Sequence, residues 1–230
     1  MTPGFVSFAR LARPAVVAAV VALAACGGSD TTNPQSARAI TRVSPDSQST
    51  AAGVKMASPL VVLVTGAGNT PLGNVAVSWT VGIGGGTVSD TTSTTDAAGH
   101  AQTTYTPGTV PAVAKVSANT PGLPGVTFTI TLVAGPPTEL RKFGSDNPAV
   151  VAGSKLTLSV KLVDAFGNAV SDKTVNWSAA GGSVAAPTST TDAGGVASVA
   201  YTVGTDPGTY SLTATVEGIP PATFTIRAIP

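Results

Sequence analysis

The sequence predicts an all-β protein in which two tandem β-sandwiches follow an N-terminal export signal. Three observations predict this fold: a composition rich in turn-forming residues, an internal repeat, and short segments in which apolar and polar side chains alternate. Glycine and proline account for 26 and 18 of the 230 residues, and Thr, Val and Ala dominate the remainder. Such a composition favours short strands joined by tight turns over helices.

The first 25 residues have the layout of a secretory signal. Two cations, Arg10 and Arg13, precede the apolar run "PAVVAAVVALAA", which ends in small residues. A charged start, an apolar centre and a small-residue end are the three regions of such a signal. The apolar run of about a dozen residues is shorter than the ~20 that a transmembrane helix needs, so a retained anchor helix is the weaker interpretation.

The only cysteine of the chain, Cys26, directly follows this signal. The run "LAAC" that ends at Cys26 resembles the lipobox of bacterial lipoproteins, as opposed to a lone buried thiol. The resemblance implies that residues 1–25 are a lipoprotein signal peptide, and that the sulfur of Cys26 receives a diacylglycerol and becomes the mature N-terminus. Because Gly27 stands where aspartate favours the inner membrane in that family, the outer membrane is implied. Two or more acyl chains give stable anchoring.

The rest of the chain contains one unit twice. The run "TSTTDA" occurs at 92–97 and again at 188–193, and "TFTI" occurs at 127–130 and again at 223–226. Further matched residues are Trp79 with Trp177, Gly99 with Gly195, and Tyr105 with Tyr201. This repeat predicts four segments: a signal peptide at 1–25, a lipidated flexible tether at 26–36, a first domain at 37–135 and a second domain at 136–230.

Within each copy the predicted strands alternate in polarity. In the second copy, Leu156, Leu158, Val160 and Leu162 alternate with polar residues, which indicates a strand with one buried and one solvated face. Further strands of the first copy are expected at 75–79, 101–105, 112–118 and 126–132. About seven short strands in ~100 residues are typical of a sandwich.

The local sequence resembles a known domain family. The succession "DAFGNAV", "VNW", "TTDAGGVASVAY" and "GTYSLTATV" is similar to the bacterial immunoglobulin-like (Ig-like) domains of group 1, which occur as tandem modules in intimin and invasin. Both copies carry the pattern, at about 36–135 and 137–230. The first copy departs from it where "GAGNTPLGNV" replaces "DAFGNAVSDKTV". The resemblance implies Ig-like sandwiches that serve as spacers or adhesion modules.

Charge and cysteine content exclude several function classes. Removal of residues 1–25 takes away two of the twelve Lys and Arg residues and none of the eleven Asp and Glu residues, which leaves a net charge near −1. The cations are scattered from Arg38 to Arg227. Nucleic acid is therefore not an expected partner, because phosphate recognition needs a dense basic face. A single cysteine also excludes an internal disulfide.

No pattern of catalytic residues is evident. The only histidine, His100, is matched by Val196, and no G-x-S-x-G motif is present. Asp96 and Asp192 are expected to cap turns that end in glycine, with calcium binding as the alternative. The run "GIGGG" at 82–86 predicts a hairpin turn. We expect no enzymatic activity, no cofactor and no metal site.

Two features could serve binding. The aromatic residues Phe143, Phe166 and Tyr210 have no counterpart in the first copy and could form a small contact patch. Val61 and Leu63 stand where the second copy has Ser159 and Lys161, so both faces of that strand are apolar. Either a neighbouring segment covers Val61 and Leu63, or they contact a partner.

These patterns lead to one hypothesis and one alternative. The hypothesis is a non-enzymatic, exported protein that is lipid-anchored to the cell envelope, at the outer membrane or cell surface. It would act as a spacer or as an adhesion-type binder of an envelope or host-surface protein or glycan. The alternative is a carbohydrate-binding or envelope-binding accessory module.

Overall fold

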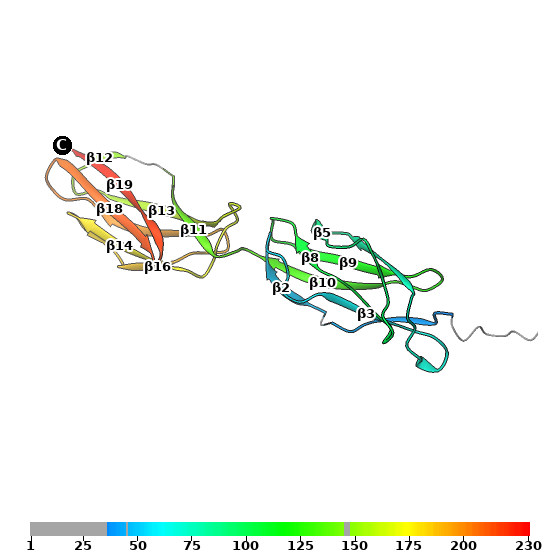
Figure 1. The fold of residues 1–230 in the computed structure, drawn as a ribbon. Helices are drawn as coiled ribbons and strands as arrows, with labels where there is room; N and C mark the ends of the chain where they lie inside the picture. The colour runs from blue at the N-terminus through cyan, green and yellow to red at the C-terminus, as the bar shows by residue number, and fades with distance from the viewer. Residues whose placement is uncertain (1–35, 45, 145–147) are drawn as a thin grey trace, which may run out of the picture. The chain divides into compact units, whose positions relative to one another are not determined.

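The computed structural model of the chain describes residues 36–44, 46–144 and 148–230. The expected signal peptide, Cys26 and nearly all of the expected tether lie outside the described residues. Apart from the short 3₁₀ turn η1 (Ala67–Asn69), every element of the described residues is a β-strand. Within the same residues no helix is long and apolar enough to cross a membrane. For the described residues the prediction of an all-β fold is therefore confirmed (Figure 1).

The first sandwich consists of two sheets. One has the order β1-β3-β7 and the other the order β2-β10-β9-β4-β6, while β5 and β8 form a separate pair. The strands of the three-stranded sheet are β1 (Ala39–Arg42), β3 (Leu60–Thr65) and β7 (His100–Thr103). Those of the five-stranded sheet are β2 (Gln48–Ala51), β10 (Val126–Val133), β9 (Val113–Asn119), β4 (Ala76–Val81) and β6 (Thr92–Thr94). The extra pair is β5 (Gly86–Val88) with β8 (Tyr105–Pro107).

The second sandwich repeats this topology. Its sheets have the orders β11-β13-β17-β15 and β12-β19-β18-β14-β16. The strands of the first sheet are β11 (Pro137–Phe143), β13 (Lys155–Asp164), β17 (Val196–Thr202) and β15 (Ser183–Val184). Those of the second sheet are β12 (Ala149–Val151), β19 (Ile219–Ile229), β18 (Gly208–Val216), β14 (Thr174–Ala180) and β16 (Thr188–Thr190). The internal repeat of the sequence thus corresponds to two β-sandwich units.

Each sandwich has its own core, built from the inward side chains of both sheets. Leu60, Val62 and Val64 of β3 are fully buried, as period-two alternation requires. The largest fully buried side chains occur as matched sets in the two units: Tyr105 and Tyr201, Phe128 and Phe224, Ile130 and Ile226. The repeat-matched aromatic residues are therefore core residues.

The two tryptophans occupy the same place in their sandwiches. Trp79 and Trp177 are 3% and 4% exposed. The indole Nε1–H of Trp79 donates to Ser93 Oγ at 2.8 Å, and that of Trp177 donates to Ser189 Oγ at 2.8 Å. Each buried indole thus satisfies its polar group with a serine of the adjacent short strand, β6 or β16.

The glycine-rich run at 82–86 is a turn, as predicted, but it does not form a hairpin. It joins β4 to β5, which belong to different sheets, because β5 pairs with β8. Gly84, Gly85 and Gly86 all have positive φ, at 90°, 63° and 99°. These conformations, which suit glycine best, let the chain leave one sheet for the other. The Tyr105 hydroxyl donates to the Gly85 carbonyl and holds the turn in place.

The buried tryptophans give a direct test of the two-core fold. Trp177→Ala should lower the free energy of unfolding of the second sandwich by about 3 to 5 kcal/mol, the usual range for truncation of a buried aromatic side chain. The first sandwich should remain folded, since the two cores share no buried residue. Urea unfolding checks this, with Trp79 as the remaining fluorophore for the first sandwich. A loss below about 1 kcal/mol would place Trp177 outside the core.

Candidate functional site

The outer face of β3 in the first sandwich is apolar. Val61 and Leu63 point away from the core, and each is half-buried, between the fully buried Leu60, Val62 and Val64. Within the sheet Val61 lies opposite Gln102 of β7, and Leu63 lies between Thr41 of β1 and His100 of β7. Neither of the two side chains is fully covered.

A third apolar residue extends this face. Val43 follows β1, its backbone N–H donates to the carbonyl of Val61 at 2.9 Å, and it is 51% exposed. The pleat directs Thr41 and Val43 to the same side of the strand. Val43, Val61 and Leu63 therefore form one small apolar surface, which we name the β3 outer patch.

The two positions of the second sandwich that match Val61 and Leu63 are polar. Ser159 Oγ lies 2.8 Å from Ser198 Oγ of the neighbouring strand. Lys161 lies opposite Arg141 in the register of β11 and β13, and Arg141 forms an ion pair with Glu139 at 2.6 Å. The two homologous faces thus differ at these two positions, although the exposed Phe143 lies opposite Ser159 in the register of β11 and β13.

Asp96 and Asp192 cap turns, as predicted. Asp96 Oδ1 accepts the backbone N–H groups of Ala98 and His100, both at 2.9 Å. Asp192 Oδ1 accepts the corresponding N–H groups of Gly194 and Val196, also at 2.9 Å. Each turn ends at a glycine of positive φ, whose added Cβ would lie 2.7 Å or less from a backbone oxygen. In the described part of the chain no three His, Cys, Asp or Glu residues gather as a metal site would require.

His100 has a surface environment. Its side chain is 40% exposed, and its Nδ1 lies 4.0 Å from Asp96 Oδ1. Asp96 already accepts two backbone N–H groups, so it is occupied as a turn cap.

The three unmatched aromatic residues are not brought into ring contact with one another in the described residues. Phe143 at the end of β11 is 52% exposed and lines a shallow groove of about 460 Å³ with Pro148, Val150 and Leu156. The Tyr210 hydroxyl donates to the carbonyl of Asp206 at 2.9 Å, so its polar end is used within its own loop. Phe143 thus has a groove beside it in the second sandwich.

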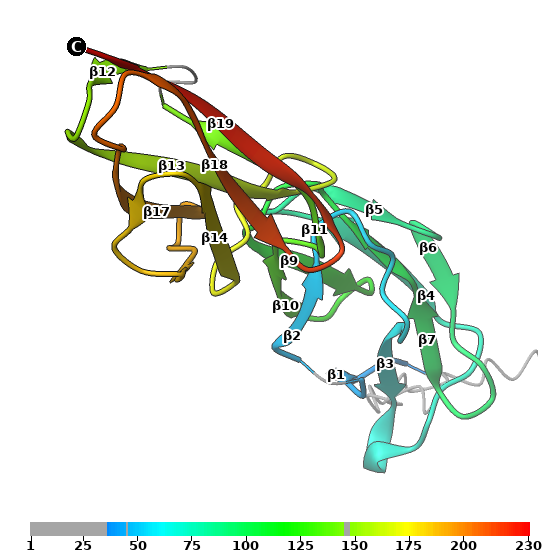
Figure 2. The ribbon, with the colours of Figure 1, turned by 90° about the vertical axis from the view of Figure 1, so that its left-hand side faces the viewer.

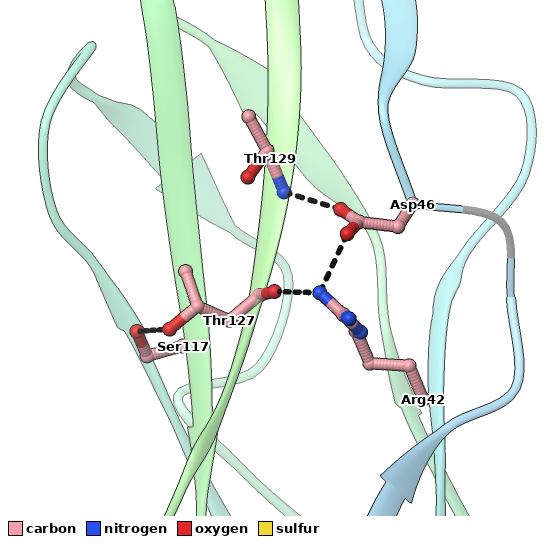
Figure 3. A network of polar contacts seen from close by, with 5 residues as sticks. All are labelled: Arg42, Asp46, Ser117, Thr127 and Thr129. Atoms are coloured by element: carbon pink, nitrogen blue, oxygen red, sulfur yellow. Dashed lines mark hydrogen bonds and ion pairs between the residues drawn. The ribbon is translucent and has the colours of Figure 1, made fainter.

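A polar network that the sequence did not suggest joins the first strand to the last strand of the first sandwich (Figure 3). Arg42 Nη1 donates to Asp46 Oδ2 at 2.5 Å and to the carbonyl of Thr127 at 2.6 Å. Asp46 Oδ1 accepts the backbone N–H of Thr129 at 2.7 Å. The pKa of Asp46 is lowered, chiefly by the hydrogen bond from Thr129 N–H. Burial raises this pKa by less, and the hydrogen bond from Ser47 N–H and the charge of Arg42 lower it further.

The second repeat carries the same two charge types at matched positions. Lys142 and Asp146 stand where the first repeat has Arg42 and Asp46. Asp146 lies outside the described residues, whereas Lys142 Nζ lies 5.8 Å from the ring centroid of Phe224. A comparison of these repeat-matched charges is the sequence signal that could have revealed the network.

A second carboxylate, Asp164, organises the turn after β13. It is 3% exposed, and its Oδ1 accepts the backbone N–H groups of Phe166 and Asn168 at 2.8 and 2.9 Å. Its Oδ2 accepts Gly135 N–H and Asn168 Nδ2, both at 2.9 Å. Burial raises the pKa of Asp164, but the hydrogen bonds from Asn168, Gly135 and Phe166 outweigh it, so that the pKa lies below the usual range.

This lowered pKa predicts a pH-dependent stability. A carboxyl group that is more acidic when folded contributes stability that is present above its unfolded pKa of about 3.9 and is lost as the pH falls through the folded pKa. Asp164→Asn should therefore lower the free energy of unfolding at pH 7 by about 1 to 3 kcal/mol. It should also reduce the loss of stability that the wild type shows on acidification below about pH 4. Urea unfolding between pH 7 and pH 2.5 (about the range of that titration) measures both effects, and equal slopes for the two proteins would contradict the assignment.

Comparison with known proteins places part of the chain in a family. Residues 145–229 match the sequence profile of the bacterial Ig-like domain (group 1). No curated protein matches the chain.

The chain is similar to several solved structures of bacterial proteins. FdeC, an Escherichia coli adhesin, is 19% identical over 83% of this chain and 64% of its own, with a TM-score of 0.53. InvD of Yersinia pseudotuberculosis is 23% identical over 83% and 57% of the two chains, with a TM-score of 0.48. Invasin, a bacterial integrin-binding protein, is 21% identical over 84% and 40%, with a TM-score of 0.40.

This chain spans less than two thirds of each of these three chains. At such identities the likeness, which is clearest for FdeC, concerns the fold alone. The profile match is more specific, because it covers nearly all of the second sandwich, β12 to β19 included. The second sandwich thus matches the profile of the bacterial Ig-like domain (group 1), and the first sandwich has the same order of strands in its five-stranded sheet.

Proposed function

We propose that this chain is a non-enzymatic surface protein of the bacterial envelope whose two Ig-like modules act as a spacer or as an adhesion-type binder. The observation that carries the proposal is the tandem duplication of one sandwich, of which the second copy matches the group 1 Ig-like profile. The acidic side chains Asp96, Asp164 and Asp192 all serve as backbone hydrogen-bond acceptors in turns. Their roles are structural.

The adhesion role is supported by the fold and by one surface. FdeC, which has the same fold, is an adhesin, and invasin binds integrin. In this chain the β3 outer patch includes two apolar side chains, Val61 and Leu63, at positions that are polar in the sister sandwich. Binding to a protein or glycan of the envelope or of a host surface is thereby assigned to the first sandwich, and the second sandwich is mainly a spacer.

Attachment to the envelope is assigned to Cys26. The lipobox-like run "LAAC" and the absence of any other cysteine support lipidation at this position. With Gly27 in the next position, the outer membrane is the proposed location. A lipid anchor gives the two sandwiches a fixed end at the membrane.

A second candidate function is recognition of an envelope carbohydrate by the second sandwich. The observation that favours it is Phe143, which is 52% exposed beside a groove. An exposed aromatic ring can stack on a sugar face, whereas the β3 outer patch offers only aliphatic side chains. Loss of binding on Phe143→Ala, with the β3 outer patch intact, would favour this candidate.

The anchor is tested by Cys26→Ser. The change removes the only sulfur that can accept a diacylglycerol by thioether linkage, so the protein should lose its lipid and leave the membrane fraction. Fractionation and mass spectrometry of the mature N-terminus measure this. Membrane retention of an unlipidated Cys26→Ser protein would show that the anchor lies elsewhere.

The binding surface is tested by the double change Val61→Ser with Leu63→Lys, which reproduces the polar residues of the second sandwich. Because both side chains point outward, the melting temperature should change little, while binding of soluble residues 36–230 to purified envelopes should fall at least tenfold, the effect of about 1.4 kcal/mol.

The matched control is Ser159→Val with Lys161→Leu, which makes the second sandwich apolar at the same positions. It should leave binding by the first sandwich unchanged. Unfolding of the Val61→Ser, Leu63→Lys variant would mean that these residues belong to the core, and the spacer role would then stand alone.

A further inference from the structure

In each sandwich the second strand and the last strand lie side by side and run in the same direction. In the first sandwich β2 pairs in parallel with β10, with Gln48 opposite Ile130 and Ala51 opposite Val133. In the second sandwich β12 pairs in parallel with β19, with Ala149 opposite Arg227 (Figure 2). Every other strand pair is antiparallel in the described residues.

This geometry determines how tension acts on the pair. The chain enters β2 at its N-terminal end and leaves β10 at its C-terminal end, at Val133. Tension between the two ends of the sandwich reaches β2 through β1 and the residues after it. It therefore pulls the two parallel strands in opposite directions along their own axes. In such a sliding motion all hydrogen bonds between the strands are strained together, because they span the strands at a similar slant.

Tension applied elsewhere would act differently. If the pull entered β10 at its N-terminal end, both forces would act at the same end of the β2–β10 pair. The bonds would then break one after another, as in unzipping. The force needed to unfold a domain depends on the barrier along the pulled direction, so the two geometries should differ in strength.

Both ends of the β2–β10 pair are extended by further hydrogen bonds. At the C-terminal end, Ala52 N–H donates to the carbonyl of Val133 at 2.9 Å. At the N-terminal end, Asp46 accepts the N–H of Thr129, and Arg42 donates to the carbonyl of Thr127 (Figure 3). The Asp46 and Arg42 side chains thus continue the strand pairing along the edge of β10 beyond Gln48.

In the second sandwich the β12–β19 pair is likewise extended by a hydrogen bond at its C-terminal end, and a backbone hydrogen bond extends it at its N-terminal end. Ala152 N–H donates to the carbonyl of Ile229 at 2.9 Å, and Arg227 N–H donates to the carbonyl of Pro148 at 3.0 Å. The same arrangement in both copies makes it a property of the repeated unit.

We propose that the parallel pair β2–β10, with its counterpart β12–β19, is a mechanical clamp that resists tension between the two ends of each sandwich. Its biological use rests on the spacer role of the proposed function, in which one end of the chain is fixed to the membrane and load on the other end passes through the two sandwiches. The mechanical property itself belongs to each sandwich and holds whether or not Cys26 is lipidated.

Single-molecule force spectroscopy on the full, unlipidated chain tests the clamp. One handle is attached to the natural thiol of Cys26. The second is attached to Pro136→Cys, after β10, or to Pro124→Cys, an exposed residue in the turn before β10. At equal pulling speed the first sandwich should unfold at severalfold higher force with the handle at position 136 than at position 124. Equal forces in the two geometries would overturn the proposal.

The second sandwich provides a check that does not depend on Pro124→Cys. In a Cys26→Ser background, handles at Pro136→Cys and the C-terminus pull β12, through β11, and β19 in opposite directions along their axes. Handles at Pro136→Cys and Glu217→Cys, which is exposed between β18 and β19, pull from the same end. The force should again be severalfold higher in the first arrangement, and a lack of difference would overturn the proposal for this unit.

The contribution of Asp46 to the clamp can be measured separately from its contribution to overall stability. Asp46→Ala removes the acceptor for Thr129 N–H and should lower the unfolding force with the handle at position 136, while the force with the handle at position 124 stays unchanged. Asp46→Asn, which keeps an acceptor oxygen, is the matched control and should retain most of the force. An equal loss in both geometries would show that Asp46 acts on overall stability alone. Because no membrane or binding partner is involved, failure here leaves the proposed adhesion role intact.

Discussion

Each sandwich depends on one constraint: the chain must cross from one sheet to the other between its first two strands. β1 pairs with β3 in one sheet and β2 pairs with β10 in the other, so the few residues between them must bridge the two layers. The bridge is fixed to both sheets, because Ser44 Oγ accepts Val61 N–H and Asp46 accepts Thr129 N–H. With a single cysteine in the chain, no disulfide within it can link the two sheets. The hydrogen bonds of Ser44 and Asp46 link them instead.

The rest of the architecture follows from this link between the two sheets. Once β1 and β2 cover their sheet edges, the inward residues of both layers form a dry core around Trp79 or Trp177, and the outward faces are free to diverge. They have diverged: Val61 and Leu63 are apolar, whereas their counterparts Ser159 and Lys161 are polar. One unit of structure can therefore supply two different surfaces without any change in its core.

Much of the fold could be predicted from the sequence, because the signals are periodic and duplicated. The alternation in "LTLSVKL" and the matched tryptophans identify strands and core without knowledge of their partners. The sheet change at 82–86 could not be predicted, since three glycines permit a hairpin and a crossing equally well. The network around Asp46 has no local sequence signal, because Asp46 accepts the backbone N–H of Thr129, which lies 83 residues away in the chain. The outward position of Val61 and Leu63 followed from alternation, whereas their partial exposure depended on β1 and β7.

Amide hydrogen exchange of Thr129 tests most directly whether the carboxylate of Asp46 links the two sheets. In the wild type this amide should be protected although it has no strand partner on that side, because Asp46 accepts its hydrogen bond at 2.7 Å. In Asp46→Ala the amides of Thr129 and of β2 should exchange faster, and those shared by β4 and β9 should keep their protection. An unchanged exchange rate of Thr129 in Asp46→Ala would contradict the account.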